Sequence, residues 1–133
     1  MVDNTNLFRR LKDKLIALPP EKWKYSDYRN GKMGHDSFSA NLENFTIELT
    51  RRGEHINPWS MFEEQYEDKY YMSVSNGEGF RMQFNDSEIS DVQILYHNVG
   101  NKVKPYYEAK EREARKKRIE EELKGLKDLE KLL

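Results

Sequence analysis

The sequence contains no cysteine, and this absence removes several kinds of chemistry. Disulfides, thiolate nucleophiles and cysteine-ligated zinc or iron–sulfur sites all require Cys. Long apolar runs are also missing, since none approaches the ~18 residues of a membrane span. The first residues have neither the basic start nor the hydrophobic stretch of a secretory signal. We therefore expect a cytoplasmic protein that does not interact with a membrane.

Hydrophobic residues are few, at 36% of the 133 residues, while charged residues reach 35% against a usual ~25%. This length suits one domain, so the excess charge must lie partly outside a core. Residues 1–101 hold 12 Lys and Arg against 16 Asp and Glu, whereas residues 102–133 hold 11 against 8. We predict a compact α+β domain over residues 1–101 and a C-terminal helical extension over residues 102–133.

Motifs that carry catalysis or bind a cofactor are absent from the sequence. The three histidines have no metal-binding spacing, and neither a nucleophile elbow, a P-loop nor a dinucleotide fingerprint occurs. We therefore predict no catalytic residues, no metal site and no cofactor, and we expect the protein not to be an enzyme. An enzyme of unrecognised type is our third functional hypothesis, after the two that are given at the end of this section.

Apolar and polar side chains alternate along residues 38–49, and this pattern predicts a β-hairpin. A two-residue turn at Glu43 and Asn44 places three apolar pairs on one face of the hairpin. These pairs are Leu42 with Phe45, Ala40 with Ile47, and Phe38 with Leu49. The opposite face is polar, so the hairpin belongs to an antiparallel sheet with one buried face.

The other segments extend and cover this hairpin. Residues 7–18 carry an apolar stripe at helical spacing, Trp23 and Tyr25 begin a first strand, and residues 70–84 form a second hairpin. The pattern dissolves over residues 50–64, which predicts a long loop. Within it, residues 58–62 are read either as a short helical turn covering the sheet or as an exposed aromatic anchor for a partner.

Residues 85–99 predict a second packed helix, with a capping signature at its start and Gly100 placed as a helix end. Pro105 is suited to the first turn of a further helix, so the break at Gly100 is either a helix end or a kink. The predicted fold class is α+β: an N-terminal helix, an antiparallel meander of about five strands, a packed helix, and a long charged C-terminal helix.

The C-terminal helix changes character along its length. Residues 108–118 are almost wholly charged, with opposite charges at helical spacing. Large apolar residues then return at heptad-compatible positions: Ile119, Leu123, Leu126 and Leu133. This stripe either folds back onto the domain or pairs with another chain.

Two functional hypotheses follow. The first is a non-catalytic protein–protein interaction module, which acts as an adaptor, a regulator or a complex subunit and binds another protein or a second copy of itself. Its predicted contact residues are Trp59, Met61, Phe62, Tyr107, Ile119, Leu123, Leu126 and Leu133. The second, less favoured hypothesis is a nucleic-acid-binding accessory protein that contacts phosphates through Lys110, Arg112, Arg115, Lys116, Lys117 and Arg118. Interspersed glutamates would weaken that phosphate-binding field.

Overall fold

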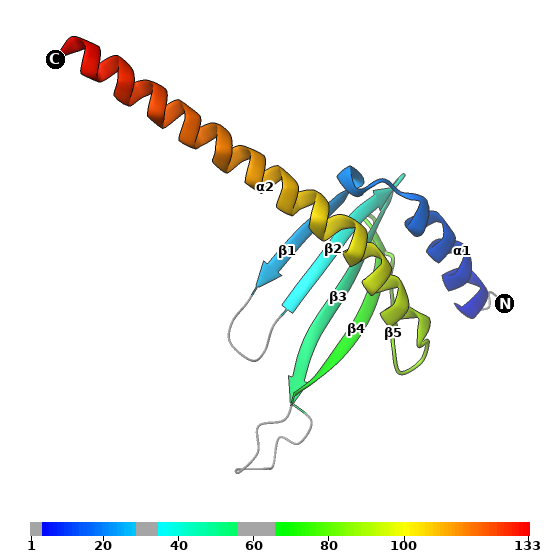
Figure 1. The fold of residues 1–133 in the computed structure, drawn as a ribbon. Helices are drawn as coiled ribbons and strands as arrows, with labels where there is room; N and C mark the ends of the chain where they lie inside the picture. The colour runs from blue at the N-terminus through cyan, green and yellow to red at the C-terminus, as the bar shows by residue number, and fades with distance from the viewer. Residues whose placement is uncertain (1–3, 29–34, 56–65) are drawn as a thin grey trace.

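The computed structural model describes residues 4–28, 35–55 and 66–133, and it has the predicted α+β architecture (Figure 1). Helix α1 (Asn4–Ala17) and a short 3-10 turn, η1 (Pro20–Lys22), precede the sheet, and helix α2 (Asp91–Leu132) follows it. The five strands are β1 (Trp23–Tyr28), β2 (His35–Leu42), β3 (Phe45–His55), β4 (Tyr66–Asn76) and β5 (Arg81–Asn85). They lie in sequence order and are all antiparallel, so the sheet is the expected five-stranded meander.

The predicted central hairpin is confirmed in its register. Phe38 pairs with Leu49, Ala40 with Ile47, and Leu42 with Phe45. Glu43, the first residue of the turn, has a positive φ of 55°, as the tight turn between these strands requires. Side-chain alternation therefore fixed this register, because a slip of one residue would have moved all six apolar side chains to the polar face.

The long loop predicted for residues 50–64 is wrong at its N-terminal end. Strand β3 continues through residues 50–55, which pair with β4, and β4 itself begins at residue 66. The alternation is hidden here because a charged residue, Arg51, takes the inward position that an apolar residue takes elsewhere on the strand. Residues 58–62, with the predicted helical turn or aromatic anchor, lie outside the described residues.

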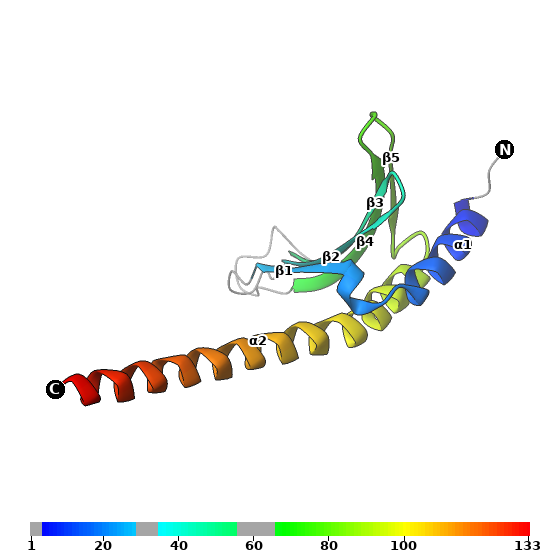
Figure 2. The same ribbon diagram turned by 90° about the horizontal axis from the view of Figure 1, so that it is seen from above.

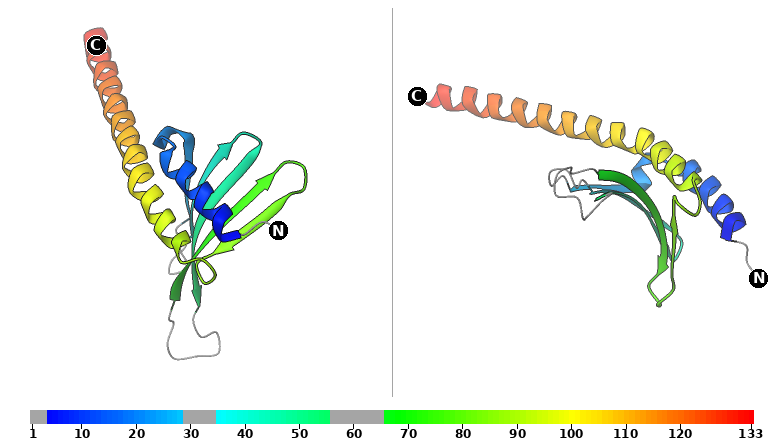
Figure 3. Two further views of the ribbon diagram at one scale, coloured as in Figure 1. Left: turned by 90° about the vertical axis from the view of Figure 1, so that its right-hand side faces the viewer. Right: turned by 90° about the horizontal axis from the view of Figure 1, so that it is seen from below.

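The sheet is strongly bent, and both helices lie on its convex side (Figures 2 and 3). Among the described residues, helices therefore cover one face of the sheet and not the other. The covered face carries the buried core, to which the strands contribute Trp23, Phe38, Leu49, Met72 and Phe84, among others. The uncovered face carries polar side chains, among them Ser39, Glu48 and Ser73 at one level of the sheet. Burial on one side only is typical of an antiparallel meander.

Two contacts tie α1 into this core. The ring of Phe8 packs on Phe84 of β5, with the ring centroids 5.6 Å apart. At the other end of the helix, the Lys102 ammonium donates hydrogen bonds to the carbonyl oxygens of Ile16 (2.9 Å) and Leu18. These carbonyls have no partner within α1, so a cation from α2 caps its C-terminal end.

Helix α2 continues through Gly100 and Pro105, so of the two predicted alternatives, a helix end or a kink, the helix end is wrong. Its 42 residues span about 63 Å at roughly 1.5 Å per residue, and Pro105 lies inside it. Gly100 is not a helix end but a point of close approach to the sheet. A Cβ at this position would lie 3.4 Å from the ring of Phe38. The packed helix and the charged helix are thus two parts of one element.

Candidate functional site

The C-terminal part of α2 leaves the body of the protein and is exposed along its whole length. Figure 1 shows this part projecting past the sheet, and every residue from 108 to 133 is exposed. Six large apolar side chains lie in it, with exposed fractions between 52% and 97%. They are Ile119, Leu123, Leu126, Leu129, Leu132 and Leu133. Of the two predicted alternatives, the structure therefore excludes folding back of the stripe onto its own domain.

These apolar residues share a face of the helix. At about 100° per residue, Ile119, Leu123, Leu126 and Leu133 fall within an arc of roughly 80°, and Leu129 lies beside it. We call these five residues the leucine stripe. An apolar stripe of this kind normally faces a core or another helix.

The basic residues of the nucleic-acid hypothesis are arranged differently. All six are exposed on α2, but by the same helical spacing Lys110, Arg112 and Arg118 point in three different directions. Glutamates lie between them, and Arg115 forms an ion pair with Glu111 at 2.8 Å. The positive charge is consequently spread around the helix rather than gathered on one face.

Tyr107, a predicted contact residue, lies at the root of the projecting part. It is half-buried against the core, and its hydroxyl donates a hydrogen bond to the carbonyl oxygen of Trp23. Its neighbour Tyr106 has the ammonium of Lys110 4.8 Å from its ring centroid. Three further predicted contact residues, Trp59, Met61 and Phe62, lie outside the described residues.

A buried polar cluster that the sequence reasoning missed joins the sheet to α2. Asp36 of β2 is only 5% exposed, and its Oδ2 accepts hydrogen bonds from Arg51 Nε (3.2 Å) and Nη2 (3.0 Å). The hydroxyl of Tyr96, from α2, donates to the same oxygen at 3.3 Å. The sequence did contain an indication of this cluster. Asp36 and Arg51 have opposite charges, and in the alternation of their paired strands they fall on the same face as Phe38 and Leu49.

The cluster extends toward solvent on both sides. Arg51 Nη1 also donates to Asp68 Oδ1 at 2.9 Å, and the ammonium of Lys104 lies 4.0 Å from Asp36 Oδ2. Burial alone would lower the pKa of Arg51, but the hydrogen bonds and charges of Asp36 and Asp68 raise it, so the guanidinium stays charged. Burial, followed by the charge of Asp36, raises the pKa of the Tyr96 hydroxyl far above its usual value of about 10.

This arrangement is suited to holding α2 on the sheet rather than to transferring protons. The Asp36 carboxylate is balanced by a fixed cation, and the neighbouring phenol is held in its neutral form across the physiological range. Within the described parts of the chain, no group of three or more His, Asp or Glu side chains is placed to hold a metal ion.

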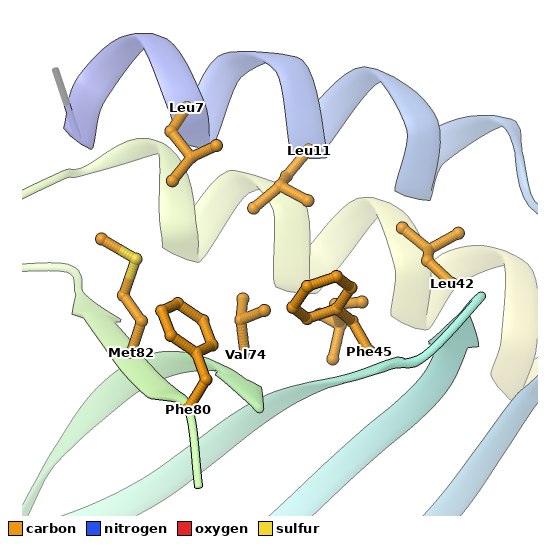
Figure 4. Close-up of a pocket in the computed structure, with 8 residues that line it drawn as sticks. Leu7, Leu11, Leu42, Phe45, Val74, Phe80 and Met82 are labelled. Atoms are coloured by element: carbon orange, nitrogen blue, oxygen red, sulfur yellow. The ribbon is translucent and has the colours of Figure 1, made fainter. Parts of the chain in front are cut away.

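An apolar pocket lies between α1 and the sheet, at the end of the molecule opposite the C-terminus (Figure 4). Its volume is about 220 Å³, and all eight lining residues are apolar. Leu7 and Leu11 reach down from α1, while Phe45 and Phe80, on two neighbouring hairpins, form the exposed part of its rim. Their rings meet edge to face with centroids 6.1 Å apart.

Comparison of the chain with protein-family models, with characterised proteins and with solved structures found no match. Functional inference therefore rests on the geometry described above. Among the described helices, none combines the length and the apolar character needed to cross a membrane.

Proposed function

We propose that the protein is a non-catalytic interaction module that binds a protein partner through the leucine stripe of α2. The observation that carries this proposal is the exposure of at least half of each of five large apolar side chains on one side of the projecting part of α2. Contiguous apolar surface of this kind marks an interaction site in a folded protein.

Energetics also favour a partner for this segment. An isolated helix is only marginally stable in water, and Gly125 lowers helix propensity within the stripe by about 1 kcal/mol relative to Ala. Burial of the stripe against a second surface would stabilise the helix and remove its leucines from water. Helix-in-groove docking through residues at such spacing is a common mode of recognition.

The test compares two charge-matched variants of the full chain. Leu123→Glu combined with Leu126→Glu alters the stripe, whereas Lys117→Gln combined with Lys124→Gln makes the same change in net charge on the opposite side of the helix. Glu and Gln both support helix formation, so both variants keep α2. Association is measured as molar mass by light scattering behind a sizing column, and as co-purification with cross-linked proteins from source cells.

We expect the leucine variant to lose association and the lysine variant to retain it. The proposal fails if the wild-type chain neither self-associates nor retains any protein that the leucine variant loses. It fails equally if the two variants lose the same associations, because the effect would then come from charge.

Nucleic-acid binding is the second candidate, favoured by the full exposure of the six basic residues at positions 110–118. Their spread around the helix and the intervening glutamates weigh against it. Salt dependence separates the two candidates. Phosphate neutralisation makes binding fall steeply between 50 mM and 200 mM salt, whereas docking through leucines is nearly indifferent to salt.

A further inference from the structure

The lining of the pocket between α1 and the sheet limits the kind of chemical group that can bind in it. None of the eight lining residues carries a polar group, so the pocket offers no partner to a carboxylate, an amide or a hydroxyl. Its volume of about 220 Å³ is below the roughly 300–1,000 Å³ of small-molecule sites. The pocket is larger than a cavity of about 150 Å³ that binds one benzene ring. Its size therefore suits a few aliphatic side chains of a docking segment better than a free ligand.

The charges beside the pocket indicate the sign of the docking segment. Helix α1 as a whole carries Arg9, Arg10, Lys12 and Lys14 against Asp13, a net charge of +3, and Lys12 among them is paired with Asp91 of α2 at 3.7 Å. By helical spacing, Arg10 and Lys14 lie on the same side of α1 as Leu7 and Leu11, and both are exposed. An acidic segment with apolar side chains on one face is therefore complementary to this site.

The leucine stripe lies in a segment of that description. Residues 119–133 hold three Lys against four Glu and one Asp, a net charge of −2. The side chains of the stripe are among the large apolar side chains that α2 exposes, each by at least half. The stripe therefore matches the pocket in both apolar character and charge.

The stripe of a given copy cannot reach its own pocket. Figures 1 and 2 show α1 and the C-terminal end of α2 at opposite ends of the molecule, with the body of the sheet between them. We propose that the pocket between α1 and the sheet binds the leucine stripe of a second copy of this chain, in a head-to-tail contact. This inference rests on the proposed function, because it names the partner of the same stripe.

A head-to-tail contact joins two different surfaces, so it permits a complementation test. One full-length variant, Leu123→Glu with Leu126→Glu, has a defective stripe and an intact pocket. The other, Phe45→Ser with Phe80→Ser, has a defective pocket and an intact stripe, and it alters side chains that are 40% and 46% exposed. Phe80→Ser alone replaces the double variant if circular dichroism shows that the latter is unfolded.

We expect each variant alone to be a monomer of 16.0 kDa at concentrations where the wild type associates, with the dissociation constant raised at least tenfold. An equimolar mixture should form a complex of twice that mass and no larger species, because only one productive contact remains in it.

Other outcomes overturn the inference. If the pocket variant self-associates as the wild type does, stripes pair with stripes and the pocket is not involved. If the mixture stays monomeric, or if the wild type itself is a monomer, a second copy is not the partner. The proposed function fails separately, through its own comparison of the leucine and lysine variants.

Discussion

Asp36 and Arg51 occupy helix-facing positions on β2 and β3, where their neighbours along each strand are apolar. Taking two charges out of water is costly, and a buried ion pair is often no more stabilising than apolar residues of the same volume. The cost of removing one partner is much larger, because the other charge stays buried. Asp36 lies deeper than Arg51, whose guanidinium also contacts Asp68.

We expect Asp36→Asn to lower the free energy of unfolding by about 3 kcal/mol, the lower end of the range for a broken buried pair, since Arg51 keeps Asp68. The control is Asp68→Asn, which removes an exposed carboxylate and should cost less than about 1 kcal/mol. Urea unfolding followed by circular dichroism measures both. Equal losses from the two variants would contradict a special role for the buried carboxylate.

The raised pKa of Tyr96 predicts that the protein loses stability at alkaline pH. Its pKa is raised in the folded state, first by burial and then by Asp36. Below about pH 10 the phenol is neutral in both states, so it adds no pH dependence. Above that pH the unfolded chain releases the proton more readily, which favours unfolding, and stability falls as pH rises.

The variant Tyr96→Phe should therefore be about 1 kcal/mol less stable than the wild type at pH 8, through the lost hydrogen bond, but fall less between pH 8 and pH 10.5. Some dependence remains because the pKa values of Tyr70 and Tyr71 are also raised, by burial and by the hydrogen bond to Glu54 respectively. Parallel stability curves for the two proteins would refute this account.

At the scale of the element, α2 combines two environments in one helix. Its first part buries Val92, Leu95, Val99 and Val103 against the sheet, whereas its last part is exposed on every side. Helical hydrogen bonds propagate from residue to residue once a helix is nucleated. The packed part therefore supplies the nucleus from which the projecting part extends.

Gly100 is a point of close approach between α2 and the sheet. We expect Gly100→Ala to raise the free energy of unfolding by up to about 1 kcal/mol, because the added methyl group meets the Phe38 ring at 3.4 Å and helix propensity improves. Gly100→Val should instead lower it by about 1–3 kcal/mol, because the extra methyl groups overpack the same ring. Thermal unfolding of both variants measures the difference. Destabilisation by both would mean that even a single methyl group is not accommodated.

At the scale of the whole molecule, stability and recognition lie at separate places. The core and the Asp36 cluster hold α2 on the sheet, while residues 119–133 touch none of the described body. A chain ending at Arg118 should consequently have a free energy of unfolding within about 0.5 kcal/mol of that of the full chain. It should lose helical signal in circular dichroism and lose association in light scattering. Unfolding of the truncated chain would instead place the stripe in the core.

The features that could be predicted from the sequence are those with a local period. The hairpin at Glu43 and Asn44, the five-stranded meander and the N-terminal helix all follow from apolar residues spaced by two or by three and four. Residues 50–55 escaped prediction because Arg51 interrupts the apolar alternation while obeying its phase. Gly100 and Pro105 predicted either a helix end or a kink; the helix does not end there, and Gly100 instead lies against the ring of Phe38.

The candidate sites divide in the same way. The leucine stripe was visible as heptad spacing in one segment, whereas the Asp36 cluster and the apolar pocket were not. Asp36, Arg51 and Tyr96 come from three elements, and up to 60 residues separate them along the chain. The pocket depends on the distance at which α1 stands from two hairpins, which no spacing in the sequence encodes.

The sequence by itself determined which residues face inward and which outward on each helix and strand, since that choice depends only on side-chain order and backbone period. Only the tertiary structure decided where those faces meet. Helix α2 carries the leucine stripe away from the body, while the apolar pocket lies between α1 and the sheet at the opposite end. These outcomes depend on how whole elements pack against one another, and they arise from contacts between residues far apart in the chain.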